Sequence, residues 1–191
     1  MARPKDETKI DAIFEATLKL VQKSGFNGLK MADVAKAAGM ATGTLYIYFK
    51  NKDVLINELF LSLKQSKTSR MMAGYNPADS FADTFRKLWF NYLDLSLAEP
   101  ERMLFIEQFA HTSFLTKKTK QQGDQMLEPL IAFLEQGMEK KIIRKMSMDI
   151  LLSQLMGPIY ETIKVQQSKK LVLTPAQKQG MFEMAWRSVT L

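Results

Sequence analysis

The residues best suited to chemistry form a short run of hydroxyl, glycine and lysine residues near the amino terminus. Hydroxyl groups, and the backbone N–H groups at the start of a helix, bind phosphate well, and lysines add the positive charge that phosphates attract. Between residues 30 and 52 this set comprises Lys30, Thr42, Gly43, Thr44, Tyr46, Tyr48, Lys50 and Lys52. The set predicts contacts to a nucleic-acid backbone, although the two tyrosines could instead be half-buried aromatics.

The elements that position these residues are predicted to be helices. Leu, Met, Lys, Gln, Glu and Ala dominate, and alternating β-branched residues are almost absent, so we expect an all-α protein. Hydrophobic periodicity and the breaks at glycine and proline predict about nine helices. Their approximate ranges are 6–24, 31–38, 42–48, 51–72, 78–97, 100–112, 121–140, 147–169 and 175–190. Gly25 should end the first helix in a left-handed conformation, and Asn51 should cap the fourth.

A tight corner is predicted within residues 30–49. Ala35 and Ala38 let two short helices approach closely, Gly39 permits the positive φ of the turn, and Val34 can meet Leu45 across it. This is the anatomy of a helix-turn-helix, whose second helix enters the major groove of DNA. A plain helical corner would share the same pattern.

Residues 25–55, GFNGLKMADVAKAAGMATGTLYIYFKNKDVL, resemble the TetR family of bacterial transcriptional regulators. The likeness covers about residues 6–60, and the rest of the chain resembles the family in length and helix layout. It implies a three-helix DNA-binding domain at 1–53 and a larger helical effector-binding and dimerisation domain at 54–191. The implied function is a homodimeric repressor that a small apolar or amphipathic effector releases from double-stranded operator DNA.

The resemblance also implies roles for single residues. Thr44 and Tyr46 match positions that contact phosphates or base edges, and Tyr48 and Lys52 match phosphate contacts. Thr42 and Gly43 match the variable start of the recognition helix, where specificity is set. Structural roles are implied for Ala35, Leu45 and Phe49.

Three positions depart from the family pattern. Lys30 stands where Ser or Thr usually caps the second helix, although Lys30 can itself reach a phosphate. Ala32 replaces a common Arg or Lys, and Ala41 replaces the Ser that caps the recognition helix, a role that Thr42 could take. These departures keep open an alternative, a ligand-binding helical protein whose DNA binding is weak or lost.

The carboxy-terminal helices are rich in aromatic residues and methionine. The expected effector pocket comprises Trp89, Tyr92, Phe105, Gln108, Phe109, His111, Met126, Met156 and Tyr160, each of which could equally belong to the core. The last two helices carry broad apolar faces that suit a four-helix dimer interface. The residues expected there are Leu151, Leu155, Ile159, Thr162, Phe182 and Trp186, for which the intramolecular core is the alternative.

Composition excludes several other classes. The 191 residues include no cysteine and a single histidine, so disulfides, thiolate metal sites and His-rich metal sites are impossible. No paired acid–base set, Ser-His-Asp spacing or glycine-rich phosphate loop is present, so we expect no enzyme, catalytic residue, metal or cofactor. No secretory signal or membrane-spanning run is seen, so the expected location is the cytoplasm, with no membrane partner.

The net charge of +7 permits nucleic acid as a partner, and the distribution of this charge along the chain shows how strongly it supports that partner. Lys and Arg number nine against six Asp and Glu over residues 1–53, thirteen against eleven over 54–145, and five against three over 146–191. The excess is therefore spread along the chain. Its placement is more informative, because Lys30, Lys50 and Lys52 flank the predicted recognition helix.

Overall fold

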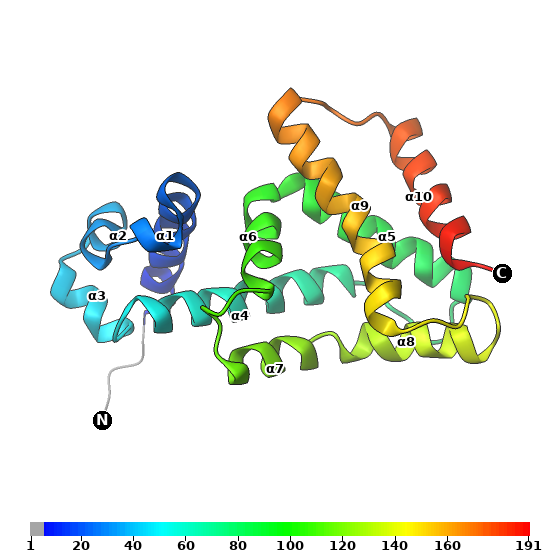
Figure 1. The fold of residues 1–191 in the computed structure, drawn as a ribbon, viewed down its shortest axis with the longest axis horizontal. Helices are drawn as coiled ribbons and strands as arrows, with labels where there is room; N and C mark the ends of the chain where they lie inside the picture. The colour runs from blue at the N-terminus through cyan, green and yellow to red at the C-terminus, as the bar shows by residue number, and fades with distance from the viewer. Residues whose placement is uncertain (1–5) are drawn as a thin grey trace. The chain divides into compact units, whose positions relative to one another are not determined.

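The computed structural model describes residues 6–191, and over that range the fold is all-α, as the sequence predicts (Figure 1). The first five residues of the predicted 1–53 domain lie outside the described residues. Ten helices occur in the described range: α1 (Glu7–Gly28), α2 (Met31–Ala37), α3 (Thr42–Tyr48), α4 (Lys52–Met71), α5 (Phe81–Ala98), α6 (Pro100–Ala110), α7 (Lys117–Gln125), α8 (Glu128–Glu139), α9 (Met148–Lys169) and α10 (Pro175–Val189). None of these helices has both the length and the hydrophobicity needed to span a bilayer.

The extra helix arises because the predicted helix 121–140 is two helices, α7 and α8. Pro129 lies in the first turn of α8 and has no N–H with which to continue the hydrogen bonding of α7. The helix restarts at Leu127, whose carbonyl accepts from the N–H of Ile131 at 2.9 Å. Proline at this position is favourable for a helix start, so the break lies a few residues after the one expected at Gly123.

Contacts divide the described chain into two compact units. One contains the residues up to Leu63 together with Phe105–Lys120, and the other contains Lys64–Leu104 and Gln121–Leu191. The first unit thus extends beyond residue 53 and includes a segment from later in the chain. The functional boundary at 53/54 stays a prediction.

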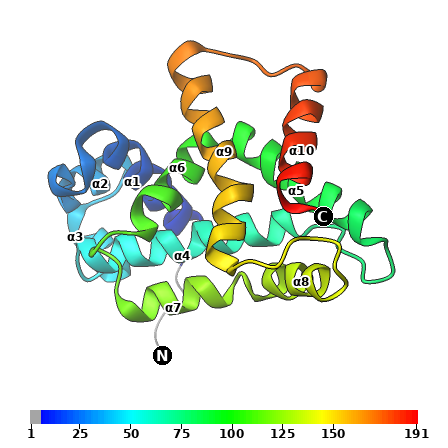
Figure 2. The same ribbon diagram turned by 45° about the vertical axis from the view of Figure 1, so that its right-hand side comes forward.

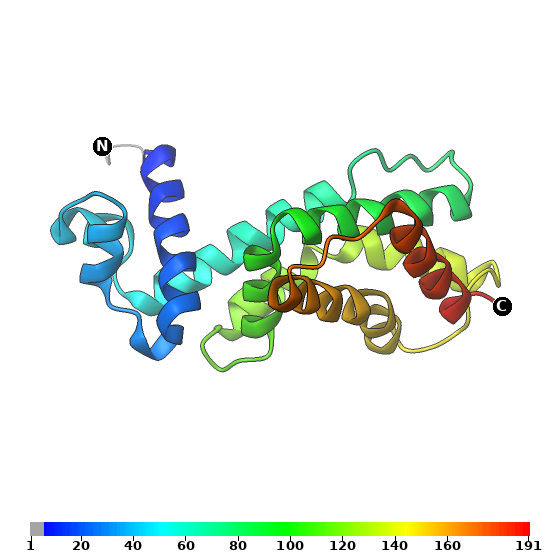
Figure 3. The same ribbon diagram turned by 90° about the horizontal axis from the view of Figure 1, so that it is seen from above.

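Two positive-φ glycines shape the first unit. Gly25, at φ 66°, kinks α1 near its end, where the sequence predicts a left-handed residue. Gly39, at φ 70°, turns the chain between α2 and α3, and the N–H of Met40 donates to the carbonyl of Ala35 at 2.9 Å. Figure 3 shows the first three helices from above.

The later segment joins the first unit through aromatic rings and one buried amide. The Phe26 ring stacks on Phe114 with centroids 3.8 Å apart and meets Phe109 edge-on at 6.2 Å. Asn57, on α4, is buried, and its amide nitrogen donates to the carbonyl oxygens of Asp53 at 2.8 Å and Phe114 at 3.0 Å. Its amide oxygen accepts from the N–H of Thr116 at 2.9 Å. One side chain therefore satisfies backbone groups of two separate segments.

In the second unit, α5, α9 and α10 contact one another, as Figure 2 shows. Aromatic rings fill the space between α5 and α10: Phe85 lies 5.0 Å from Trp186, and Phe182 lies 5.5 Å from both Trp89 and Phe90. The buried apolar side chains of α5 thus form part of the core of this unit.

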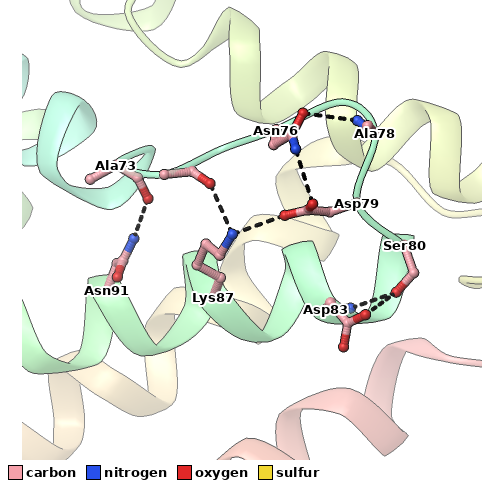
Figure 4. Close-up of polar contacts among 9 residues, drawn as sticks. Ala73, Asn76, Ala78, Asp79, Ser80, Asp83, Lys87 and Asn91 are labelled. Atoms are coloured by element: carbon pink, nitrogen blue, oxygen red, sulfur yellow. Dashed lines mark hydrogen bonds and ion pairs between the residues drawn. The ribbon is translucent and has the colours of Figure 1, made fainter.

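Side chains of α5 fasten the α4–α5 connection, residues 72–80, to that helix (Figure 4). The ammonium of Lys87 donates to the carboxylate of Asp79 at 2.9 Å. The amide nitrogen of Asn91 donates to the carbonyl oxygen of Ala73 at 2.9 Å. The end of α4 and the body of α5 are therefore linked by hydrogen bonds as well as by chain connectivity.

We expect Asn57→Ala to destabilise the protein by about 2–4 kcal/mol, because it removes three part-buried hydrogen bonds to backbone groups of Asp53, Phe114 and Thr116. Urea denaturation followed by circular dichroism measures the change. Asn57→Asp is the matched variant, because its carboxyl keeps an oxygen that accepts from the N–H of Thr116. At a pH low enough to protonate this carboxyl, the loss of stability should be smaller than for Asn57→Ala. A loss below about 0.5 kcal/mol for Asn57→Ala would show that this amide does not hold the segment.

Candidate nucleic-acid interface and ligand cavity

Helix α3 presents its polar side chains on one exposed face. Leu45, inside the helix, and Phe49, at its end, are fully buried, and the Phe49 ring packs 5.7 Å from the ring of Phe14 on α1. This anchoring turns Thr42, Gly43 and Tyr46 outward, and half of the surface of Tyr46 is exposed. Thr44 and Tyr48 are half-buried at the edges of the face. The structure thus gathers on α3 the five residues predicted there.

The three predicted lysines have different surroundings. Lys30, before α2, and Lys50, after α3, are exposed. Lys52 is half-buried, and its ammonium donates to the carbonyl oxygen of Phe26 at 3.3 Å and lies 4.3 Å from the centroid of the Phe26 ring. It therefore joins the start of α4 to the end of α1, while an ammonium with three donors can still offer one to a phosphate.

Helices α2 and α3 begin without a side-chain cap. The residue before α2 is Lys30 and the residue before α3 is Ala41, and neither makes a capping hydrogen bond with its side chain. The expectation that Thr42 could take over this role is wrong, because Thr42 is already the first residue of the helix. By contrast, Asn51 caps α4 as predicted, with its side-chain oxygen accepting from the N–H of Val54 at 2.9 Å.

Ile47 belongs to the exposed face of α3 and was missed in the sequence. Ile47 is 77% exposed, more than its neighbour Tyr46 at 50%. The helical period holds the signal: Ile47 lies two residues after the buried Leu45 and two before the buried Phe49, so it points away from both. An exposed branched apolar side chain can contact the methyl group of thymine in the major groove.

The second unit contains an apolar cavity. Its free volume is about 40 Å³, and its lining comes from the end of α4 and from α5, α8 and α9. The lining residues are Met71, Phe85, Leu88, Trp89, Tyr92, Leu130, Phe133, Leu134, Leu152, Leu155 and Met156. The indole N–H of Trp89 is buried and has no hydrogen-bond partner among the described residues. Such a cavity has the apolar walls that a small-molecule site needs, and the buried indole N–H belongs to one of its lining residues.

Only part of the predicted pocket lies here. Trp89, Tyr92 and Met156 line the cavity, and Tyr160 adjoins it, with its ring 6.3 Å from that of Tyr92. Phe105 and Phe109 instead stack on each other at 4.3 Å in the first unit. The remaining three predicted residues do not line the cavity: Gln108 and His111 are exposed and Met126 is half-buried.

The predicted dimer residues mostly belong to the core of the chain itself. Leu151 and Ile159 are fully buried, and Leu155 and Phe182 are 8% exposed. These four leave little or no surface for a second copy, and their assignment to the dimer interface stays a prediction that their burial does not support. The other two, Thr162 and Trp186, are half-buried.

The surfaces that α9 and α10 leave exposed are different. On α9 the outward residues 150, 154, 158, 161 and 165 follow helical spacing. Among the apolar ones, Ile150 is 57% exposed and Val165 is 39% exposed, and on α10 Met184 is 67% exposed. The sequence shows both the buried and the exposed apolar residues of α9, and only packing tells them apart.

Comparisons with known proteins agree with this architecture. Residues 13–59 match the family model described as bacterial regulatory proteins, tetR family, and residues 80–190 match the one described as tetracyclin repressor-like, C-terminal domain. An HTH-type transcriptional regulator of Haemophilus influenzae is 24% identical over 182 residues, which is 94% of each chain. The crystal structure of a TetR family transcription regulator from Marinobacter aquaeolei superposes with a TM-score of 0.90 at 24% identity, covering 99% of each chain.

One solved structure with a ligand has the same fold. The transcriptional regulator FadR from Bacillus subtilis, in complex with stearoyl-CoA, matches with a TM-score of 0.64 at 19% identity. The match covers 84% of this chain and 88% of that one.

Adding the missing cap should stabilise the corner. We expect Ala41→Ser to raise the free energy of unfolding by about 1 kcal/mol, because its hydroxyl can accept from an unpaired N–H in the first turn of α3. Thermal denaturation measures the change. Ala37→Ser, at the exposed last residue of α2, is the matched control and should be neutral or slightly destabilising. Equal effects of the two substitutions would contradict the capping argument.

Proposed function

Because this chain belongs to the TetR family of bacterial transcriptional regulators, we propose that it is a repressor that binds operator DNA as a homodimer and leaves it when a small effector occupies the cavity. The relatives found are transcriptional regulators rather than enzymes. The observation that carries the proposal is the outward face of α3, with Thr42, Gly43, Tyr46 and Ile47 exposed on a helix anchored by Leu45 and Phe49.

The DNA contacts divide into two kinds. Lys30, Lys50 and Lys52 flank α3 and supply charge for phosphates, which positions the protein without reading sequence. The exposed side chains of α3 supply base readout in the major groove, where hydroxyls donate or accept and Ile47 offers an apolar surface. In a dimer, the two recognition helices would read half-sites about one helical turn, ~34 Å, apart.

The outward faces of α9 and α10 suit the second copy. Ile150, Val165 and Met184 are apolar and largely exposed in the single chain. Two helices from each copy would form a four-helix interface, which buries these side chains. The proposed interface therefore uses the helical stripes next to those expected from the sequence.

The cavity suits an apolar or amphipathic effector. It is lined almost entirely by apolar side chains, and the matched FadR structure holds stearoyl-CoA. Occupation would act on DNA binding through α4, whose residues belong to both compact units and whose displacement would change the spacing of the recognition helices.

One observation favours the alternative, a ligand-binding protein with weak DNA binding. Both helices of the corner lack side-chain caps, so each loses a stabilising hydrogen bond at its start and the corner is held less firmly. Fluorescence anisotropy with a labelled duplex from upstream of its own gene, at several salt concentrations, decides between the two. The affinity of a regulator should fall steeply as salt rises. The logarithm of its binding constant, plotted against the logarithm of the salt concentration, should have a slope of about −0.9 per phosphate contacted. Binding no tighter than to a scrambled duplex would favour the alternative.

Gly43→Ala should separate stability from DNA binding. No atom lies within 4 Å of a Cβ built at Gly43, so alanine should raise the free energy of unfolding by about 0.5–1 kcal/mol through its higher helix propensity. Operator affinity should fall by about tenfold or more, because the added methyl group meets the DNA backbone. Anisotropy and thermal denaturation measure the two effects. Unchanged affinity in a stabilised variant would show that DNA does not approach Gly43.

Charges on the outward faces of α9 and α10 should break the dimer. We expect the double variant Ile150→Glu, Met184→Glu to elute as a monomer when size-exclusion chromatography is coupled to light scattering, because each substitution would bury a charge in the interface. Ile47→Glu places the same substitution on an exposed apolar residue of α3 and should leave the mass unchanged. A double variant that remains dimeric would locate the interface elsewhere.

A further inference from the structure

A lysine side chain is buried in the second unit without an acidic partner. Lys67, on α4, is 4% exposed, and its ammonium makes no hydrogen bond or ion pair with any described residue. The ammonium lies 5.5 Å from the centroid of the Tyr92 ring. Burial, followed by repulsion from Lys64, lowers the pKa of Lys67 from 10.5 to about 8. At neutral pH it remains mainly protonated, so a positive charge is kept in an apolar interior.

The position of Lys67 makes this charge unusual. Leu63, Lys67 and Met71 follow each other at intervals of four residues, and all three are buried on the inward stripe of α4. An apolar residue would suit this stripe, whereas buried charges normally have partners. The other buried lysine, Lys64, follows that rule, since it pairs with Asp124 at 3.2 Å. Lys67 therefore lacks an anionic partner among the described residues.

The buried ammonium and the cavity share their neighbours. Met71, one helical turn after Lys67, lines the cavity, and so does Tyr92, beside which the ammonium lies. Two further buried groups can donate hydrogen bonds and have no partner among the described residues. They are the indole N–H of Trp89, which lines the cavity one turn before Tyr92, and the hydroxyl of Thr68, next to Lys67.

We propose that Lys67 and the apolar cavity form one binding site for an amphipathic carboxylic acid. An ionised carboxylate only accepts hydrogen bonds, so it can take those that the ammonium, the indole N–H and the hydroxyl have to offer. The apolar tail of the acid lies among the leucine, methionine and aromatic side chains of the cavity. This inference rests on the proposed function in one respect, because it names the chemical class of the effector.

The tail has to make room for itself. A free volume of about 40 Å³ holds a small group rather than an alkyl chain, so side chains have to move as the acid enters. Met71 and Met156 line the cavity and have flexible, unbranched side chains that can repack around a ligand. Binding therefore enlarges the space between the helices.

Direct binding to the full chain without DNA tests the site. The probes are octanoate, dodecanoate and hexadecanoate below their aggregation concentrations, each compared with the alcohol of the same length by isothermal titration calorimetry. We expect at least one acid to bind about tenfold or more tightly than its alcohol, because only the acid forms the charge-assisted contact. Equal affinities of acid and alcohol, or no binding of any acid, would overturn the proposal.

Lys67→Met identifies the residue. It removes the charge and keeps an unbranched apolar chain, so it should fold at least as stably as the wild type and should reduce the affinity for the acid to that for the alcohol. Lys140→Met, at an exposed position after α8, is the matched control and should bind the acid like the wild type. Trp89→Phe should weaken acid binding while thermal denaturation shows a folded protein. An acid preference that persists in Lys67→Met would contradict the assignment.

The same measurements separate this inference from the proposed function. Acid binding that depends on Lys67 but leaves operator affinity unchanged would keep the site and refute its role as the effector site. Operator binding without any acid binding would keep the regulator and refute the site.

Discussion

Helix α3 has seven residues, too few to hold a helical conformation in water without help. The helix has no side-chain cap at its start and no basic residue in its last turn. What holds it is packing: Leu45 and Phe49 are fully buried, and Phe49 lies against Phe14 of α1. The same anchoring sets the rotation of α3 about its axis, and so decides which side chains face outward. The whole candidate DNA interface depends on this one apolar contact.

The first unit is completed by a segment that lies far along the chain. Phe109 and Phe114 surround Phe26, and Asn57 satisfies backbone groups of residues 114 and 116. Lys52 adds a contact with the carbonyl and ring of Phe26. Residues on either side of the helical corner thus converge on one phenylalanine, and a change in the 105–120 segment is felt directly by the end of α1.

Much of this could be predicted from the sequence, for physical reasons that differ between regions. The corner was predictable because glycines, small residues and apolar spacing there are local signals, and the corner residues lie where these signals put them. Helix α9 was predictable as a helix, but it carries apolar residues on two adjacent stripes. Periodicity alone does not say that Leu151 and Leu155 face the core while Ile150 faces outward. The contacts of Asn57, Lys52 and Lys67 join segments far apart in sequence, so no local pattern indicated them.

The hydrogen bonds from Lys87 and Asn91 to the α4–α5 connection limit which helices of the second unit can move apart. They tie the two walls of the cavity that α4 and α5 provide, so these walls resist separation. The opposite walls are α8 and α9, and the turn between them is tied to the carboxy terminus, where the N–H of Arg144 donates to the carbonyl of Val189 at 2.7 Å. A ligand that displaces α4 would therefore carry α5 with it, whereas one that displaces α8 and α9 would carry the end of α10.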